Sequence, residues 1–219
     1  MRRIVNPSRR LAKLQRRAGR RIARLRCLVD SLSAPPTAEK DRVVAWVVIE
    51  ARNLWAGFLR AYYLSGARGT RTASGTRVSF VGSRFPNAHA ALIYSVRLLK
   101  NRGFSGSSVR RQDEPAWHVY GDYLRLCRAV GFSNLAQIDS AFSYTTTFFE
   151  LLTPVRNFYA HRCDETFRKA RQVGVRLGLS SRPDLRPTQI MCSKLPGRPQ
   201  NIITDWLDDL ENVIQLFCT

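Results

Sequence analysis

Apolar side chains recur at steps of three and four residues between positions 7 and 32. They are Leu11, Leu14, Ala18, Ile22, Leu25 and Leu28. A helix turns once every ~3.6 residues, so this spacing places them on one face. The other face is basic and carries Arg9, Arg10, Lys13, Arg16, Arg17, Arg20, Arg21 and Arg24. The segment therefore predicts an amphipathic helix, with one side packed against apolar neighbours and the other open to phosphate groups.

The rest of the chain repeats this helical pattern between loops. Helices are predicted over 37–65, 87–102, 114–130, 133–140, 154–177 and 201–217. Loops are predicted over 66–86, 103–113 and 178–200, where Gly, Ser, Pro and Arg accumulate. A short strand over 78–81 would have no partner. The expected fold is all-α: an antiparallel bundle of four to six helices over 37–219, preceded by a basic amphipathic helix at 1–33.

The charge of the chain is strongly unbalanced. Its 36 Lys and Arg residues against 16 Asp and Glu residues give a formal net charge of +20. Such a field concentrates polyanions, and binding to them releases condensed counterions. Most of the cations are arginines, whose planar guanidinium grips phosphate and stacks on bases. RNA is therefore the first expected partner; an anionic membrane surface and a merely solvated basic surface are the alternatives.

The cysteine pattern and the apolar content limit the compartment. The five cysteines lie far apart and contain no Cys-x-x-Cys pair, so reduced thiols packed as small apolar residues are expected. No apolar run approaches the ~20 residues that cross a bilayer. The Arg-rich start lacks the apolar core of a signal peptide, although an organelle transit peptide has a similar composition. A cytoplasmic protein with no metal, no other cofactor and no membrane partner is the expectation.

The most informative segment is Thr153-Pro-Val-Arg-Asn-Phe-Tyr-Ala-His-Arg162, in which four residues separate Arg156 from His161. The other two histidines also follow an arginine by a similar spacing. These matches run from Arg84 to His89 and from Arg111 to His118. A proline interrupts each of them, so neither is expected within one continuous helix. Arg156 and His161 alone share a predicted unbroken helix.

This segment resembles the HEPN family, small α-helical bundles marked by an Arg, four to six residues and a His. The residue after the Arg is often polar in that family, and here it is Asn157. The resemblance implies a ribonuclease in which two copies of the Arg–His helix meet across a homodimer and form one composite site. It covers the helices from about 37 to 217, but not the basic first helix or the 66–86 loop.

The same resemblance implies a biological setting. It points to a toxin or a phage-defence effector, for which an antitoxin or another regulatory protein is a further implied partner. Family members partnered with nucleotidyltransferase antitoxins carry a Tyr three residues after the His. Asp164 stands at that position here, so that class of antitoxin is not expected.

The RNA cleavage expected from these residues requires protein side chains and no metal ion. RNA carries its own nucleophile, the 2′-OH, and His161 can act as general base or general acid. Arg156 can neutralise the charge that develops on the phosphoryl oxygens. Asn157 lies four residues before His161 on the same helix face, where a hydrogen bond can orient the imidazole. Arg156 lies about 140° round the helix from His161, so its side chain must curl to share a substrate.

Glu50 and Asn53 are expected to support this site. They are three residues apart in an otherwise apolar part of the second helix, so they share a face. Members of the family that the chain resembles often carry a polar residue there. A face exposed to water, or a hydrogen bond inside the core, explains the pair equally well. For Arg156 and His161 the corresponding alternatives are an ion pair with a nearby acid and a hydrogen bond to a carbonyl.

Further residues are expected to contact RNA. Arg162 can hold phosphate and Tyr159 can stack on a base, although packing of Tyr159 in the core is an alternative. The contacts expected from the basic helix are Arg16, Arg17, Arg20 and Arg24. Asp164 and Glu165 would repel phosphate unless Arg162 or Arg168 pairs with them.

Two other functions remain open. The bundle can be a non-catalytic module that presents the basic helix to structured RNA, with no role for His161 in bond breaking. It can also be an adaptor that binds a protein partner, with the basic segment as a localisation signal. The net charge supports the ribonuclease and the RNA-binding module equally, and only the Arg156–His161 pair distinguishes these two functions.

Overall fold

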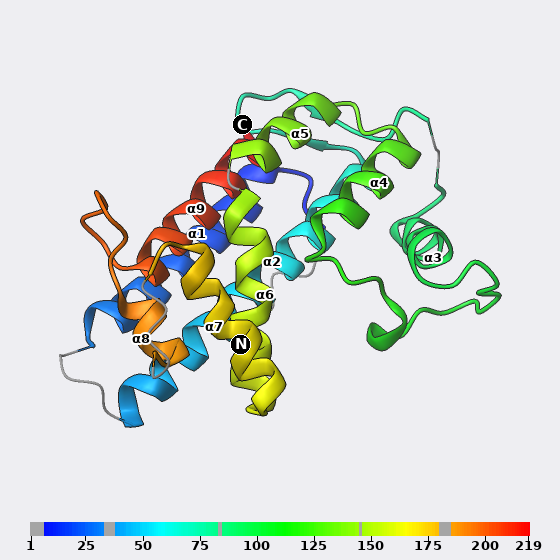
Figure 1. Ribbon diagram of the computed structural model, residues 1–219. Helices are drawn as coiled ribbons and strands as arrows, with labels where there is room; N and C mark the ends of the chain where they lie inside the picture. The colour runs from blue at the N-terminus through cyan, green and yellow to red at the C-terminus, as the bar shows by residue number, and fades with distance from the viewer. Residues whose placement is uncertain (1–6, 33–37, 83–84, 145, 180–184) are drawn as a thin grey trace. The chain divides into compact units, whose positions relative to one another are not determined.

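The computed structural model describes residues 7–32, 38–82, 85–144, 146–179 and 185–219 of the chain (Figure 1). The α-helices over these residues are α1 (Leu11–Asp30), α2 (Ala38–Arg68), α3 (Ala88–Leu99), α4 (Tyr120–Val130), α5 (Leu135–Tyr144), α6 (Thr146–His161), α7 (Asp164–Arg176), α8 (Pro187–Cys192) and α9 (Ile202–Cys218), and Arg111–Asp113 form one 3-10 turn. Two short strands, β1 (Thr70–Arg71) and β2 (Arg77–Val78), pair antiparallel. The predicted all-α class is confirmed.

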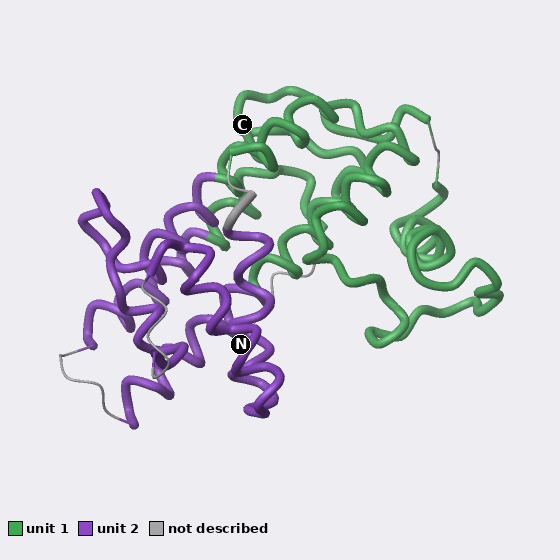
Figure 2. The backbone as a smooth tube through the Cα atoms, in the orientation of Figure 1, with its two compact units in different colours: residues 1–18, 54–144, 213–219 green, residues 19–53, 145–212 purple. Residues whose placement is uncertain are grey.

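The chain forms two compact units, each built from separate segments (Figure 2). Unit 1 contains residues 1–18, 54–144 and 213–219, and unit 2 contains residues 19–53 and 145–212. The helices α1, α2 and α9 each divide their residues between both units. Within the described residues, no helix combines the length and the apolar character needed to cross a membrane.

Phe217 lies at the centre of the core of unit 1. Its ring is fully buried and lies 5.0 to 6.3 Å, between centroids, from five other aromatic rings. These rings belong to Trp55, Phe58, Tyr62, Tyr123 and Phe142. Most of the pairs are edge-to-face, which suits the quadrupole of aromatic rings. The last turn of α9 is therefore an integral part of this core.

The 66–86 loop contains a small hairpin. The strand expected near 78–81 had no predicted partner, but Val78 pairs with Thr70 from the same loop. The partner was missed because each strand has only two residues, too few for a recognisable alternation of polar and apolar side chains. Gly75, with φ of 93°, allows the tight turn between the strands. The backbone N–H of Ala73 donates to the carbonyl oxygen of Cys218 at 2.9 Å, which ties the hairpin to the end of α9.

The helix predicted over 114–130 begins at Tyr120 instead. Glu114 is buried, and its carboxylate accepts hydrogen bonds from Arg60 at 2.5 Å and from the indole N–H of Trp117 at 2.8 Å. A buried charge is stable only with such partners, so these contacts fix residues before the helix in a non-helical path. The helical spacing of the segment alone did not reveal them.

The long helix predicted over 154–177 is two helices, α6 and α7, separated by Arg162 and Cys163. Pro154 lies inside α6 and does not begin it. It removes one backbone hydrogen bond, which normally disfavours this position. Buried side chains on both sides of Pro154, including Leu151 and Val155, keep the helix continuous. The break comes later, where Arg162 adopts a positive φ of 45°.

The 178–200 segment, predicted as a linker, contains the short helix α8. Ile190 and Met191 of α8 are buried, and α8 contacts α7 in unit 2. Pro187 is the first residue of α8, a favourable position for proline. The prediction of a bare linker was wrong because one helical turn is too short to show a period.

The prediction that the cysteines pack as small buried residues was partly wrong. Cys127 and Cys218 are buried, but Cys27 and Cys163 are exposed.

Candidate functional site

Helix α1 has the predicted division into an apolar and a basic face. The predicted RNA contacts Arg16, Arg17, Arg20 and Arg24 are all exposed. The apolar face ends in Val29, which is 5% exposed, whereas the predicted Leu28 is 37% exposed. Val29 lies four residues after Leu25, so it continues the buried stripe more closely than Leu28 does. Residues 1–6 and 33 of the predicted 1–33 helix lie outside the described residues.

Two other arginines of α1 are bound to acids within unit 2. Arg21 forms an ion pair with Glu50 of α2. Arg26 forms ion pairs with Asp208 at 2.5 Å and Glu211 at 2.6 Å on α9. The basic helix therefore has two kinds of arginine: those paired with acids, and those exposed along the face that bears Arg16 to Arg24.

Glu50 and Asn53 share a face, as their spacing predicted. The amide nitrogen of Asn53 donates to Glu50 Oε1 at 3.2 Å, and Glu50 Oε2 accepts from Arg21. Their contacts are with each other and with α1, and no hydrogen bond between described residues joins either of them to Arg156 or His161. The pair thus holds α1 against α2.

His161 is the last residue of α6 and its side chain is exposed. No described residue forms a hydrogen bond or an ion pair with its imidazole. The alternative of a histidine bonded to a neighbouring carbonyl is therefore not observed among these residues. An exposed imidazole at a helix end is accessible to a ligand.

The guanidinium of Arg156 bends towards the next residue of α6. Its Nη1 donates to Asn157 Oδ1 at 3.1 Å, and Asn157 lies on the same helix face as His161. Asn157 therefore orients the guanidinium of Arg156. The predicted hydrogen bond from Asn157 to the imidazole of His161 is not observed among the described residues, where Asn157 Oδ1 accepts from Arg156 instead. Arg156 is half-buried, and its Nε is buried with no hydrogen-bond partner among the residues that the structure describes.

Arg52 of α2 is a cation near Arg156 that the sequence analysis did not identify. Burial, and then the positive charge of Arg156, lower the pKa of Arg52. Two half-buried guanidiniums thus contribute positive charge to the same region of unit 2. The one signal in the sequence was a charged residue within the apolar stretch that also contains Glu50 and Asn53.

Tyr159 and Arg162 belong to one hydrogen-bonded chain in unit 2. Tyr159 is 6% exposed, and its hydroxyl lies 2.8 Å from Thr188 Oγ1. The hydroxyl of Thr188 donates to Asp41 Oδ1, and Arg162 Nη2 lies 3.0 Å from Asp41 Oδ2. The ring of Tyr159 is covered by the core, so the alternative of core packing is confirmed in place of base stacking. Arg162 pairs with Asp41 while its side chain stays exposed, so its predicted contact with phosphate remains a prediction.

The acids after His161 are partly neutralised. Glu165 forms an ion pair with Lys169 at 2.5 Å, one turn later on α7. Lys169 was not among the partners predicted for it. Asp164 is exposed in the first turn of α7, where the helix dipole favours a negative charge.

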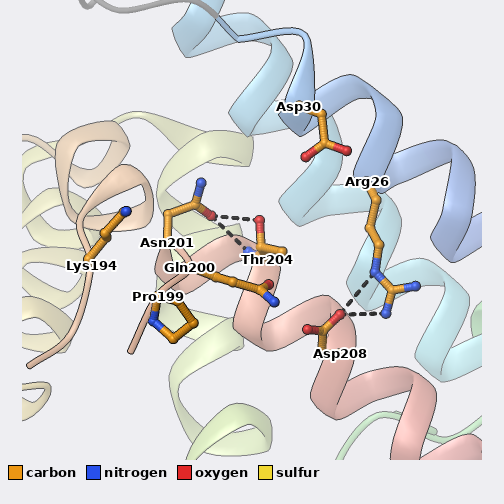
Figure 3. A pocket seen from close by; sticks show the side chains of 8 residues that line it. All are labelled: Arg26, Asp30, Lys194, Pro199, Gln200, Asn201, Thr204 and Asp208. Atoms are coloured by element: carbon orange, nitrogen blue, oxygen red, sulfur yellow. Dashed lines mark hydrogen bonds and ion pairs between the residues drawn. The ribbon is translucent and has the colours of Figure 1, made fainter. Parts of the chain in front are cut away.

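A pocket of about 400 Å³ lies elsewhere in unit 2 (Figure 3). Its lining residues are Arg26, Asp30, Lys194, Pro199, Gln200, Asn201, Thr204 and Asp208. Several of them bind each other: Arg26 pairs with Asp208, and Asn201 Oδ1 accepts from the backbone N–H and the hydroxyl of Thr204. None of the predicted site residues lines this pocket.

The acidic helix α9 carries one strongly shifted carboxyl. Burial, and then the negative charge of Asp205, raise the pKa of Asp209 to about 6. Among the described residues, no group of three or more His, Cys, Asp or Glu side chains has a geometry that can hold a metal ion. Two other acids of this helix, Asp208 and Glu211, bind Arg26.

Comparison of the chain with protein families, with curated proteins and with solved structures found no match.

Proposed function

We propose that the protein is a metal-independent endoribonuclease in which Arg156 and His161 act on the same phosphodiester. One observation carries this proposal: the hydrogen bond to Asn157 turns the Arg156 guanidinium towards the helix face that bears His161. Arg156 and His161 are five residues apart, which is ~7.5 Å along the axis of an ideal helix. Arg52 adds a second positive charge near Arg156.

The proposed reaction breaks RNA with its own hydroxyl. His161 removes the proton of the 2′-OH, and the 2′-oxygen attacks the adjacent phosphorus. The bond from phosphorus to the 5′-oxygen breaks, and this oxygen takes a proton from an acid. The products are a 2′,3′-cyclic phosphate and a 5′-hydroxyl. Arg156 stabilises the charge that accumulates on the phosphoryl oxygens.

We also propose a homodimer and a cellular role. One imidazole cannot supply the base and the acid of the same step, and two α6 helices from two copies would supply both. In this proposal the enzyme works in the cytoplasm as a toxin or phage-defence effector. A regulatory protein such as an antitoxin restrains it.

The test is cleavage of total RNA by the wild-type protein in the presence of EDTA. We expect fragments that end in 2′,3′-cyclic phosphate, because no step of the proposed reaction uses a metal ion. End analysis by phosphatase and acid treatment identifies these termini. Binding of RNA without any cleavage would contradict the proposed ribonuclease activity and support a non-catalytic RNA-binding protein.

The second candidate is a non-catalytic RNA-binding module. The exposed arginines of α1 favour it, since Arg16, Arg17, Arg20 and Arg24 are open to solvent while Arg21 and Arg26 are bound to acids. Phosphate contacts of this kind position a protein on RNA without reading its sequence. Both candidates require this surface, and only the enzyme requires His161.

We expect replacement of these four exposed arginines by glutamine to weaken RNA binding in a salt-dependent way. Each phosphate contact contributes about 0.7 to the slope of log K against log salt for a single strand, so four lost contacts flatten the slope by about 3. Fluorescence anisotropy at several salt concentrations measures this. The matched control replaces the same four residues by lysine, which keeps the charge and most of the slope. An unchanged slope in the glutamine variant would show that α1 is not the binding surface.

A further inference from the structure

We propose that Asp41 is a positioning residue, which together with Arg162 fixes the break between α6 and α7 and so presents His161 at the free end of α6. This inference rests on the proposed function for the catalytic meaning of His161. It concerns residues of unit 2 alone, and it assigns Arg162 a role different from phosphate binding.

The backbone of Arg162 requires an explanation. Its φ of 45° is the one positive value among the described residues other than glycine. The left-handed region is unfavourable for a side chain with a Cβ, because the Cβ crowds the following carbonyl. This conformation ends α6 at His161, and α7 begins two residues later at Asp164. Other contacts must therefore hold Arg162 in place.

The contacts that hold Arg162 converge on Asp41 of α2. Both carboxylate oxygens of Asp41 are used: Oδ2 lies 3.0 Å from Arg162 Nη2, and Oδ1 accepts from the hydroxyl of Thr188 on α8. The Thr188 hydroxyl lies 2.8 Å from that of Tyr159, a buried residue of α6 two positions before His161. One carboxylate thus connects α2, α8, the end of α6 and the residue at the break.

The break has an electrostatic consequence for His161. In the continuous helix predicted from the sequence, Asp164 and Glu165 would follow His161 by three and four residues and would share its face. Two carboxylates there would repel the phosphate on which His161 acts. The left-handed residue interrupts this spacing, and Glu165 pairs with Lys169 along α7. The Asp41–Arg162 pair therefore stabilises a break that removes this helical spacing between His161 and the two acids that follow it.

The test compares variants of these two residues in kinetics on RNA. We expect Asp41→Asn and Arg162→Ala to lower kcat about 10- to 100-fold with little change in KM, because the site is misplaced while the exposed arginines are intact. We expect Arg162→Gly to keep nearly full kcat, since glycine adopts a positive φ without the ion pair. Glu150→Gln is the matched control: it removes the exposed pair of Glu150 with Arg176, also between α6 and α7, and leaves kcat unchanged.

A second measurement separates this inference from the proposed function. The ¹H–¹⁵N imidazole signals of His161 in the full chain report its surroundings whether or not RNA is cut. We expect them to shift in Asp41→Asn and Arg162→Ala and to stay near wild type in Arg162→Gly and in the double variant Asp41→Asn/Arg162→Gly. If the wild-type protein cuts no RNA but the signals shift in this way, the positioning role of Asp41 is supported and the proposed ribonuclease function is contradicted.

Two results would overturn the positioning role. One is Asp41→Asn with unchanged His161 signals and unchanged kcat. The other is weaker RNA binding by Arg162→Gly together with wild-type RNA binding by Asp41→Asn. That result would mean that Arg162 contacts phosphate directly. If Asp41→Asn alone unfolds the chain, the double variant decides, because glycine at 162 no longer needs the carboxylate.

Discussion

Replacement of His161 by alanine is expected to lower RNA cleavage in EDTA by a factor on the order of 10² to 10⁴, while the affinity for RNA stays the same. General acid–base catalysis by one side chain contributes about this much to a rate. His161 is exposed and no described residue binds its imidazole, so its removal leaves no partner unpaired and costs little stability. Cleavage rates and anisotropy binding curves of the two proteins, measured side by side, give the result.

His89 supplies the matched control for this experiment. It follows an arginine by the same spacing as His161, but its Nε2 is bonded to the carbonyl oxygen of Ser107 at 2.7 Å. His89→Ala is therefore expected to cut RNA at the wild-type rate. Equal cleavage by wild type and His161→Ala would remove His161 from the mechanism, and equal loss in both histidine variants would point to a general effect on folding.

Replacement of Phe217 by alanine is expected to lower the free energy of unfolding by about 3–5 kcal/mol. The buried ring contacts five other aromatic rings in unit 1, so its loss leaves a cavity that none of them can fill without leaving its own packing. A loss of this size is a large part of the ~5–15 kcal/mol that stabilises a typical domain. Urea unfolding followed by circular dichroism measures it.

Tyr144→Ala is the control for the Phe217 prediction. Tyr144 is also aromatic, but it is 59% exposed, and its replacement is expected to change the unfolding free energy by less than about 0.5 kcal/mol. A Phe217→Ala variant as stable as Tyr144→Ala would mean that the end of α9 does not pack into the core of unit 1. A change in the slope of unfolding against urea would instead indicate a change in the surface exposed on unfolding.

The period of apolar residues predicted most of the helices. The buried face of α1, from Leu11 to Leu25, follows the spacing read from the sequence, and α3 begins after Asn87 as its cap predicted. Helix α9 also lies where it was expected. Long amphipathic stretches are readable because their own residues carry the pattern, whatever packs against them. The exposed arginines of α1 were predicted for the same reason.

The candidate site was only partly predictable. The sequence located Arg156, Asn157 and His161 on one helix, but it assigned the hydrogen bond of Asn157 to the wrong neighbour. It did not identify Arg52, and it left base stacking and core packing of Tyr159 as alternatives, whereas the structure shows a buried ring. Each of these errors concerns a partner from another helix or the direction of a side chain, which no spacing within one segment determines.

The sequence by itself determined an all-α chain, a basic face on the first helix and an Arg–His pair on a late one, because these features depend on residues a few positions apart. The tertiary structure decided where α6 ends, since Arg162 takes a left-handed conformation beside Asp41, 121 residues away in the chain. It also decided that Glu114 is buried against Arg60 and that Phe217 lies among rings of α2, α4 and α5. Local periodicity records which face of a segment is apolar; it contains no information about which distant charge or ring will meet that face.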